Sequence, residues 1–352
     1  MNKKNICIVV GARPNFVKIA PLIKAIEKTE GACYELVYTG AENDPTLEAT
    51  LFDDLQMPSP TKYLGVNSVS LNEITSRVIA EFDAFLENRP VDVVIVVDDL
   101  ASTMATAIVT KKRGIKLAHL VAGTRSFNIQ MPKEINRLVI DALSDYLFTA
   151  GVKSNSIATR EQHETSQTYM VGNILMDTLR NNHTRLRKPQ IDLTEGRYLV
   201  LTLNRKLLLA DTNKLKSLLD TIVAQAGDIP VYAPLRPQAF EVVASLNTKI
   251  RLLDSLSYLE FGWLTAHALG IITDSGNVAE EATFNGVPCI TLNSYTEHVE
   301  TVTVGSNVLV GGDEEKLSEA LGLMLSGQWK KCALPDRWDG RTAERIVQIL
   351  MS

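Results

Sequence analysis

The sequence predicts an α/β protein built from two doubly wound parallel-sheet domains with a cleft between them. Short apolar runs rich in β-branched residues alternate with longer segments that have helical spacing. The apolar runs are nearly continuous, which is typical of strands in a parallel sheet covered on both faces. The chain of 352 residues is also long for a single hydrophobic core and natural for two.

The first series of elements extends to about residue 150. Its apolar runs predict strands over 6–10, 34–38, 93–97, 116–120 and 146–149. The spacing between them predicts helices over 17–29, 71–88, 102–113 and 133–144. Strands and helices therefore alternate, as in a chain of βαβ units.

A second series follows the polar, charged stretch 181–197. It predicts strands over 198–203, 230–233, 250–253, 270–273 and 288–292, and helices over 215–225, 258–268 and 278–284. We expect an N-terminal domain over 1–175 and a C-terminal, nucleotide-binding domain over 176–335. A final segment, 336–352, is expected to pack back on the first domain through a helix over 341–351.

Composition limits the classes of function. The net charge of −5 argues against a broad surface for nucleic acid or anionic membranes, although it does not exclude a local cationic pocket. The four cysteines are scattered and form no CxxC pair, which fits a reducing compartment. The N-terminal apolar run is about five residues, shorter than a signal-peptide core, and no stretch approaches the ~20 residues of a membrane span. We expect a soluble, cytoplasmic protein.

The loop after the first strand reads GARPNFVKIAPL. It matches neither the dinucleotide fingerprint nor the P-loop. Gly11 suits a tight turn, and Arg13 and Lys18 lie near the start of the following helix. An arginine beside helix-terminal amides suits a phosphate group. A solvated basic helix start fits the spacing equally well.

A second strand-end motif reads TDSGNVAEEA, residues 273–282. Ser275 and the free amides of a helix N-terminus could hold a diphosphate, and Glu280 or Glu281 could accept hydrogen bonds from ribose hydroxyls. Taken alone, the motif favours a simpler interpretation, in which Ser275 caps the helix and the acids, placed in the first turn or so, complement its dipole.

Two further acidic motifs are candidates for proton transfer. Asp98 and Asp99 end a very apolar strand and precede a helix, so one of them could serve as a general base, or either could cap the helix. Glu134 and Arg137 are spaced i, i+3 and could simply pair on a helix surface. The five histidines show no metal-ligand spacing, so no metal is expected.

The ordered set GARPNFVKIAPL, STMATAIVTKKRGIKLAHLVAGTRSF, MPKEINR, VGNILMDTL, ITDSGNVAEEA and GVPCITL resembles the non-hydrolysing UDP-N-acetylglucosamine 2-epimerases over essentially the whole chain. The resemblance implies two Rossmann-like domains of the GT-B type with a UDP-sugar in the interdomain cleft. It implies interconversion of UDP-GlcNAc and UDP-ManNAc through elimination and re-addition of UDP, no added cofactor or metal, and a homodimer.

The resemblance also implies roles for individual residues. Asp99 matches a proposed acid/base aspartate, and Glu134 and Arg137 match the glutamate and arginine of the family's PEE-NR motif. The positions that match binding residues for nucleotide, phosphate, ribose or sugar are Arg13, Lys18, Arg137, Asn204, Arg205, Ser275, Gly276 and Glu281.

This sequence departs from the family pattern where the chemistry is expected. VAGTR stands where the family has EAGLR, so a catalytic glutamate becomes Val121. TLNR stands in place of TGHR or TLHR, so a histidine becomes Asn204, and TEHV in place of TERP turns an arginine into His298. The other substituted motif positions are Ala41, Glu42, Leu235, Asn277 and Val299.

Valine cannot transfer a proton in any state, and positioned acid/base groups typically contribute ~10²–10⁴-fold each. We therefore expect a family member that binds a UDP-sugar with epimerisation weak or lost, acting alone or beside an intact paralogue. Two alternatives stay open. One is an active 2-epimerase in polysaccharide precursor synthesis, with Asp99 and Glu134 carrying the proton transfers. The other is a GT-B glycosyltransferase that uses the same cleft.

Overall fold

The computed structural model describes residues 3–352 and divides into two compact units. The first unit extends to Asn181 and also includes Asp336–Ser352, and the second is Asn182–Pro335. Each unit has one sheet, and every strand pairing in both sheets is parallel. The predicted fold class, two doubly wound parallel-sheet α/β domains, is confirmed.

The first sheet has seven strands in the order β3-β2-β1-β4-β5-β6-β7. They are β1 Lys4–Val10, β2 Ala32–Tyr38, β3 Lys62–Tyr63, β4 Val93–Val97, β5 Lys116–Leu120, β6 Tyr146–Thr149 and β7 Gln167–Met170. The central strand β4 is buried along its whole length, as its five consecutive β-branched residues require. The strand order reverses between β1 and β4, so the loops after these two strands flank the topological switch point.

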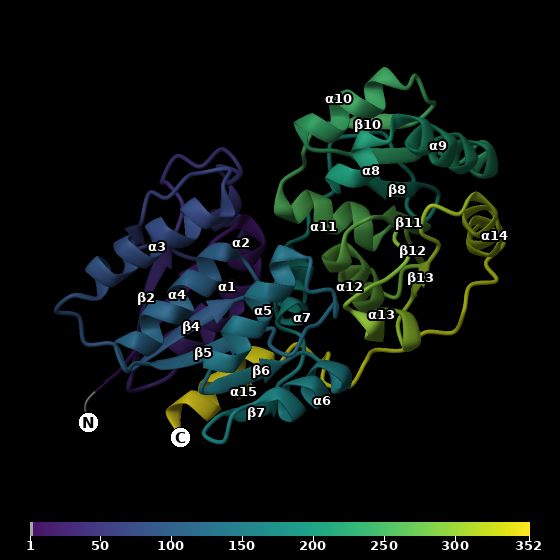
Figure 1. Cartoon of the computed structure of the whole chain (residues 1–352). Coiled ribbons are helices and arrows are strands. Elements are labelled where there is room, and N and C mark those ends of the chain that lie inside the picture. The colour runs from purple at the N-terminus through teal and green to yellow at the C-terminus, as the bar shows by residue number, and fades with distance from the viewer. Residues whose placement is uncertain (1–2) are drawn as a thin grey trace. The chain divides into compact units, whose positions relative to one another are not determined.

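Helices cover both faces of this sheet. They are α1 Arg13–Glu27, α2 Leu51–Leu55, α3 Leu71–Leu86, α4 Ala101–Lys112, α5 Pro132–Leu143, α6 Val152–Glu161, α7 Ile174–Asn182 and α15 Thr342–Met351. Helices α3, α4 and α5 pack side by side on one face, and α1 packs against the C-terminal helix α15 on the other (Figure 1). The return of the chain to the first unit therefore completes the layer beside α1.

The second sheet has six strands in the order β10-β9-β8-β11-β12-β13. They are β8 Leu199–Thr202, β9 Val231–Pro234, β10 Arg251–Leu253, β11 Gly270–Thr273, β12 Cys289–Thr291 and β13 Asn307–Leu309. The helices of this unit are η1 His183–Arg185, α8 Lys206–Ala210, α9 Thr212–Ala226, α10 Pro237–Ser245, α11 Tyr258–Ala266, α12 Gly276–Asn285, α13 Val299–Thr303 and α14 Glu314–Leu325. The order reverses between β8 and β11, which defines a second switch point.

The predicted elements of both series are present, with ends that shift by a few residues. The largest shift is at α1, which begins at Arg13 and not at residue 17 because Pro14 suits the first turn of a helix. The prediction missed the short edge strands β3, β7 and β13, which carry polar residues, and the helices α2, α6, α8, α10, α13 and α14. It also missed α7, which spans the expected boundary at residue 175. This helix belongs with the first unit, where the Asp177 carboxylate accepts hydrogen bonds from the amides of Thr342 and Ala343 at 3.1 and 2.8 Å.

Among residues 3–352, none of the helices combines the length and the apolarity that crossing a bilayer would require.

Candidate functional site

The candidate residues lie at the two switch points, where ligands of doubly wound proteins bind beyond the carboxyl ends of the strands. In the first unit, the loop after β1 carries Arg13 and Lys18, and the loop after β4 carries Asp98 and Asp99. Loop and helix residues 121–137 follow the next strand, β5.

The loop after β1 is packed tightly against α4. A Cβ atom on Gly11 would lie 2.2 Å from the Ser102 hydroxyl oxygen, so glycine is required by close approach. The φ of Gly11 lies outside the left-handed region, so the close approach of α4, and not the backbone conformation, favours glycine here. The side-chain oxygen of Asn15 accepts hydrogen bonds from the amides of Gly11 and Ala12 at 3.0 and 3.2 Å. The two backbone amides just before α1 are therefore already occupied by the chain itself.

Both basic residues of this loop are paired with carboxylates. The Arg13 Nε atom lies 2.6 Å from each oxygen of Glu48. The Lys18 ammonium lies 2.6 Å from Asp98 Oδ1, and the Lys18 side chain is 6% exposed. The expectation of a solvated basic helix start is therefore wrong for Lys18.

Asp98 and Asp99 diverge because the strand ends at Val97 and Asp98 has φ +58°. Asp98 turns toward α1, and Asp99 turns toward α5, where its carboxylate lies 2.6 Å from Arg137 Nη2. Neither caps α4, whose N-cap is Leu100 without a side-chain hydrogen bond. The capping alternative is thus wrong. Burial would raise the pKa of Asp99, but Lys133 and Arg137 outweigh it and hold that pKa below its ordinary value.

Glu134 and Arg137 are buried at 3% and 5% exposure and do form an ion pair of 3.2 Å. The expectation of a pair on the helix surface is therefore wrong. Glu134 also accepts hydrogen bonds from the Ser126 amide, the Ser126 hydroxyl and the Phe127 amide at 2.8 to 3.0 Å. These hydrogen bonds overcome the effect of burial and lower the pKa of Glu134. The carboxylate holds the 126–127 loop in place.

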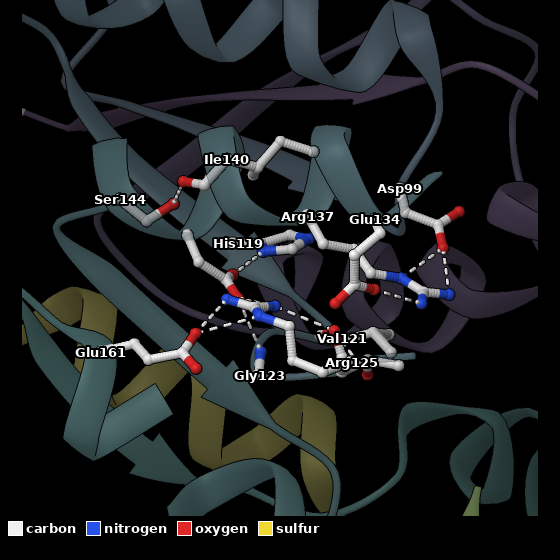
Figure 2. Close-up of polar contacts among 12 residues, drawn as sticks. Asp99, His119, Val121, Gly123, Arg125, Glu134, Arg137, Ile140, Ser144 and Glu161 are labelled. Atoms are coloured by element: carbon white, nitrogen blue, oxygen red, sulfur yellow. Dashed lines mark hydrogen bonds and ion pairs between the residues drawn. The ribbon is translucent and has the colours of Figure 1, made fainter. Parts of the chain in front are cut away.

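Val121 begins the loop after β5 and has φ +75°. A β-branched residue in this region is a conformational outlier, which costs about 1–3 kcal/mol and persists only when its surroundings impose it. The amides of Val121 and Ala122 both donate to the carbonyl of Phe148, at 3.1 and 3.0 Å. Figure 2 shows Val121 and, close by, Arg125, Glu134 and Arg137.

A buried polar network fixes the rest of this loop (Figure 2). Asp141 accepts from the Gly123 amide at 3.0 Å, lies 2.7 Å from Arg125 Nη1 and lies 2.5 Å from His119 Nδ1. The other ring nitrogen of His119 lies 2.9 Å from the Asp98 carbonyl oxygen. The two ring nitrogens of His119 therefore link Asp141 to the backbone of the β4 loop. His119 and Arg125 overcome burial and lower the pKa of Asp141.

Three non-glycine residues with positive φ, Asp98, Val121 and Phe127, thus lie in the loops after β4 and β5. Backbone strain of this kind clusters at functional sites. It supports the location chosen from the sequence motifs.

The second switch point is organised by Asp274. Its Oδ2 atom accepts hydrogen bonds from the amides of Asn204 and Arg205, both at 2.8 Å, and so closes the loop after β8. Burial raises the pKa of Asp274. The Asn204 side chain is exposed, and Arg205 donates through Nε to the Asp274 carbonyl at 3.1 Å with its guanidinium 5.8 Å from the centroid of Tyr295.

Ser275 is the N-cap of α12, but its side chain makes no capping hydrogen bond. The simpler interpretation of this motif, a capping serine, is therefore wrong. Gly276 is the first helical residue, and a Cβ there would lie 2.7 Å from the His298 ring. The His298 ring therefore lies against the start of α12.

The two acids of the motif lie in the second turn of α12 and are buried, at 3% for Glu280 and 8% for Glu281. Their expected place in the first turn is wrong, because α12 starts at Gly276. Glu280 Oε1 lies 2.7 Å from His298 Nδ1, so His298 is anchored against this helix. Within residues 3–352, no group of three or more His, Cys, Asp or Glu side chains is arranged to hold a metal ion.

The model of the family described as UDP-N-acetylglucosamine 2-epimerase matches residues 24–351. The chain belongs to this epimerase family. It is 34% identical over 363 residues to the UDP-N-acetylglucosamine 2-epimerase of Methanocaldococcus jannaschii, covering 97% of this chain and 98% of that protein.

Two further comparisons concern a second relative and a solved structure. The chain is 33% identical to the UDP-2,3-diacetamido-2,3-dideoxy-D-glucuronate 2-epimerase of Pseudomonas aeruginosa, with 90% of each chain covered. The crystal structure of the M. jannaschii enzyme in complex with UDP-GlcNAc and UDP superposes with a TM-score of 0.87, at 33% identity and 99% coverage of both chains. This epimerase-family fold of two GT-B-type domains is therefore shared.

Sequence reasoning missed several residues that organise this epimerase-family site. The missed residues are Asn15, Glu48, His119, Asp141 and the structural role of Asp274. One signal was available. Glu134, Arg137 and Asp141 follow the spacing i, i+3, i+7, which places three polar side chains on one face of α5. The others depend on tertiary contacts that spacing does not reveal.

Proposed function

We propose that this epimerase-family protein binds a UDP-sugar and that its 2-epimerase activity is weak or lost. The single observation that carries the proposal is Val121. It stands at the end of β5 in a strained conformation, inside an intact frame formed by Gly123, Arg125 and Asp141, and brings no carboxylate to the loop.

The remaining carboxylates support weak catalysis. Inverting a sugar carbon requires a group that removes a proton and one that returns it, and such groups work best when their pKa lies near the working pH. Asp99 and Glu134 both have lowered pKa values and both pair with Arg137. As anions held by an arginine, they are poor proton donors and weak bases. With valine in place of a third acid, we expect a loss of at least ~10²-fold.

The second unit supports retained nucleotide binding. Helix α12 presents its first amides beside a Ser275 hydroxyl that makes no capping bond, and Arg205 lies at the neighbouring loop. Helix N-terminal amides, a hydroxyl and a guanidinium are donors that suit a diphosphate. The M. jannaschii relative, whose structure holds UDP-GlcNAc and UDP, has the same fold over 99% of its chain.

Calorimetric titration with UDP and UDP-GlcNAc tests the binding half. We expect both nucleotides to bind. Ser275→Ala should weaken the affinity for UDP by about 10-fold through loss of a charge-assisted hydrogen bond. Lys216→Gln is the matched control, because Lys216 is an exposed residue of α9 paired only at the surface with Asp220. If the unaltered protein binds neither nucleotide, this half of the proposal fails.

A double reversion tests the catalytic half. Val121→Glu with Asn204→His returns a carboxylate and an imidazole to the two loops, and we expect epimerisation of UDP-GlcNAc to rise above that of the unaltered protein. A folded, UDP-binding double variant without any gain would show that other residues limit the chemistry.

A second candidate function, active 2-epimerisation of UDP-GlcNAc or a related UDP-sugar in polysaccharide precursor synthesis, is favoured by one observation. Asp99 and Glu134 are both held within 3.2 Å of the same buried arginine, Arg137, so two carboxylates are brought together at the end of the first sheet. Exchange of the sugar C2 proton with solvent would favour this alternative.

We further propose that the protein works in the cytoplasm as a homodimer, or beside an intact epimerase, without a metal or nicotinamide cofactor. Light scattering of the purified protein, alone and mixed with such an epimerase, distinguishes the two assemblies. A monomer under both conditions would exclude both.

A further inference from the structure

Asp98 occupies an unusual place at the first switch point. It follows the fully buried strand β4 and has φ +58°, a region that aspartate reaches more readily than most residues but still at a cost. In this conformation its carboxylate reaches across to α1. Oδ1 lies 2.6 Å from the Lys18 ammonium and Oδ2 accepts from the Asn15 side-chain amide at 2.7 Å.

These two partners are the side-chain donors that the β1 loop directs toward the switch point. Asn15 is 1% exposed and Lys18 is 5% exposed, so bulk water cannot take the place of Asp98 on these two donors unless the site rearranges. The Asp98 side chain is more accessible, at 18%. An anion that approaches from solvent therefore meets the negative charge of Asp98 before it can reach Lys18.

The neighbouring cations are matched in the same way. Arg13 pairs with Glu48, Lys133 pairs with Asp99, and Arg137 pairs with Asp99 and Glu134. At the carboxyl end of the first sheet, the cations carried by the candidate motifs are thus neutralised by the chain's own carboxylates. Asp98 differs from the other carboxylates of this set because its backbone lies in the left-handed region.

We propose that Asp98 is a resident counter-anion: it occupies the position on Lys18 and Asn15 that a phosphate or carboxylate group of a ligand would take. The first unit then disfavours anionic groups at this switch point and offers its polar groups to the uncharged, hydroxyl-bearing part of a ligand. The inference deepens the proposed function, on which it rests, by assigning the charge preference of the same site.

The test is the affinity for inorganic pyrophosphate, measured by calorimetry in the full-length protein. Asp98→Asn keeps the shape and the left-handed conformation, which asparagine tolerates, and removes the charge. We expect pyrophosphate to bind at least about 10-fold more tightly than to the unaltered protein, because Lys18 gains a charge-assisted contact with the probe. Asp98→Gly, which relieves the backbone strain as well, should give the same gain if the asparagine variant folds poorly.

Two controls locate the effect. Asp83→Asn removes an exposed carboxylate that pairs with Arg113 and should leave pyrophosphate binding unchanged. Adding Lys18→Gln to Asp98→Asn should abolish the gain. Equal pyrophosphate affinity with and without the Asp98 carboxylate would overturn the proposal, and so would a gain that survives Lys18→Gln. UDP binding by the unaltered protein is read separately, so failure of the proposed function is distinguishable from failure of this inference.

Discussion

The two switch points of this molecule carry an aspartate at the same topological position and use it in different ways. Asp98 follows β4 and Asp274 follows β11, each just beyond the strand at which its sheet reverses order. Asp98 binds an ammonium and an amide side chain. Asp274 binds two backbone amides of the opposite loop. The first carboxylate balances charge, and the second shapes a loop.

The surroundings extend this difference. Buried ion pairs lie beside the first switch point, and Val121 has a strained backbone there. The pKa values of Asp99 and Asp141 are lowered. At the second, the pKa of Asp274 is raised by burial and Arg205 contacts a carbonyl and an aromatic ring. The same doubly wound topology thus forms two kinds of strand-end site. At the first switch point the cations are paired with carboxylates, and at the second hydrogen-bond donors remain near the α12 N-terminus.

The largest expected effect is on stability, and it separates the two edges. Asp141→Asn removes the negative charge that contacts both His119 and Arg125, and should destabilise the protein by about 3–5 kcal/mol, as breaking a buried pair does. Asp274→Asn keeps an oxygen for the two amides and should cost less than ~1 kcal/mol. Urea unfolding of both variants measures the difference, and equal losses would contradict the distinction.

The next effect is on ligand affinity. Arg205→Gln should weaken the binding of UDP by about 10–100-fold, since it removes a charged donor near the α12 N-terminus. Arg13→Gln should change UDP affinity less than about threefold, because Glu48 already neutralises Arg13. Calorimetry with UDP compares the two. A larger loss for Arg13→Gln would reverse the assignment of nucleotide binding to the second unit.

A smaller effect concerns strain. Val121→Gly should stabilise the fold by about 1 kcal/mol, because release of the strained φ exceeds the entropic cost of glycine. Asn277→Gly, in the first turn of α12, should instead destabilise it by about 0.5–1 kcal/mol. Thermal unfolding of the two variants should show changes in stability of opposite sign. Destabilisation by both would mean that Val121 is not strained.

The subtlest effect is the sign of the pH dependence. The lowered pKa of Asp141 contributes stability that is present above its ordinary value of 3.8 and is lost as the pH falls through the native value. The raised pKa of Asp274 acts in the opposite direction, so its contribution becomes more favourable as the pH falls from the raised value toward 3.8. Unfolding free energies of Asp141→Asn and Asp274→Asn from pH 3 to 7, each compared with the unaltered protein, should differ in the sign of their slopes.

Much of the fold was predictable because its strands are apolar and continuous. The runs VVIVV and GIIT, for example, leave little choice but buried parallel strands. The edge strand β7, QTYM, carries no such signal, and α7 was not predicted because it spans the boundary expected at residue 175. Edge strands and helices such as α7 are specified by tertiary contacts, here those of Asp177 with the start of α15.

The position of the site was also predictable, but its electrostatics were not. Motifs after β1, β4 and β11 identified the strand ends at which ligands of such folds bind. Sequence spacing could not reveal that Lys18 is neutralised by Asp98, a residue 80 positions away, or that Glu134 is used to hold Ser126 and Phe127. Such pairings depend on how loops from different strands meet.

The central claim, nucleotide-sugar binding without normal epimerisation, is tested most directly by proton NMR of UDP-GlcNAc in deuterated water. At a protein concentration that saturates UDP-GlcNAc binding, we predict that the C2 proton signal persists and that no UDP-ManNAc appears. Rapid loss of the C2 proton signal, with or without epimerised product, would show that Asp99, Glu134 or another group transfers the proton and would contradict the account.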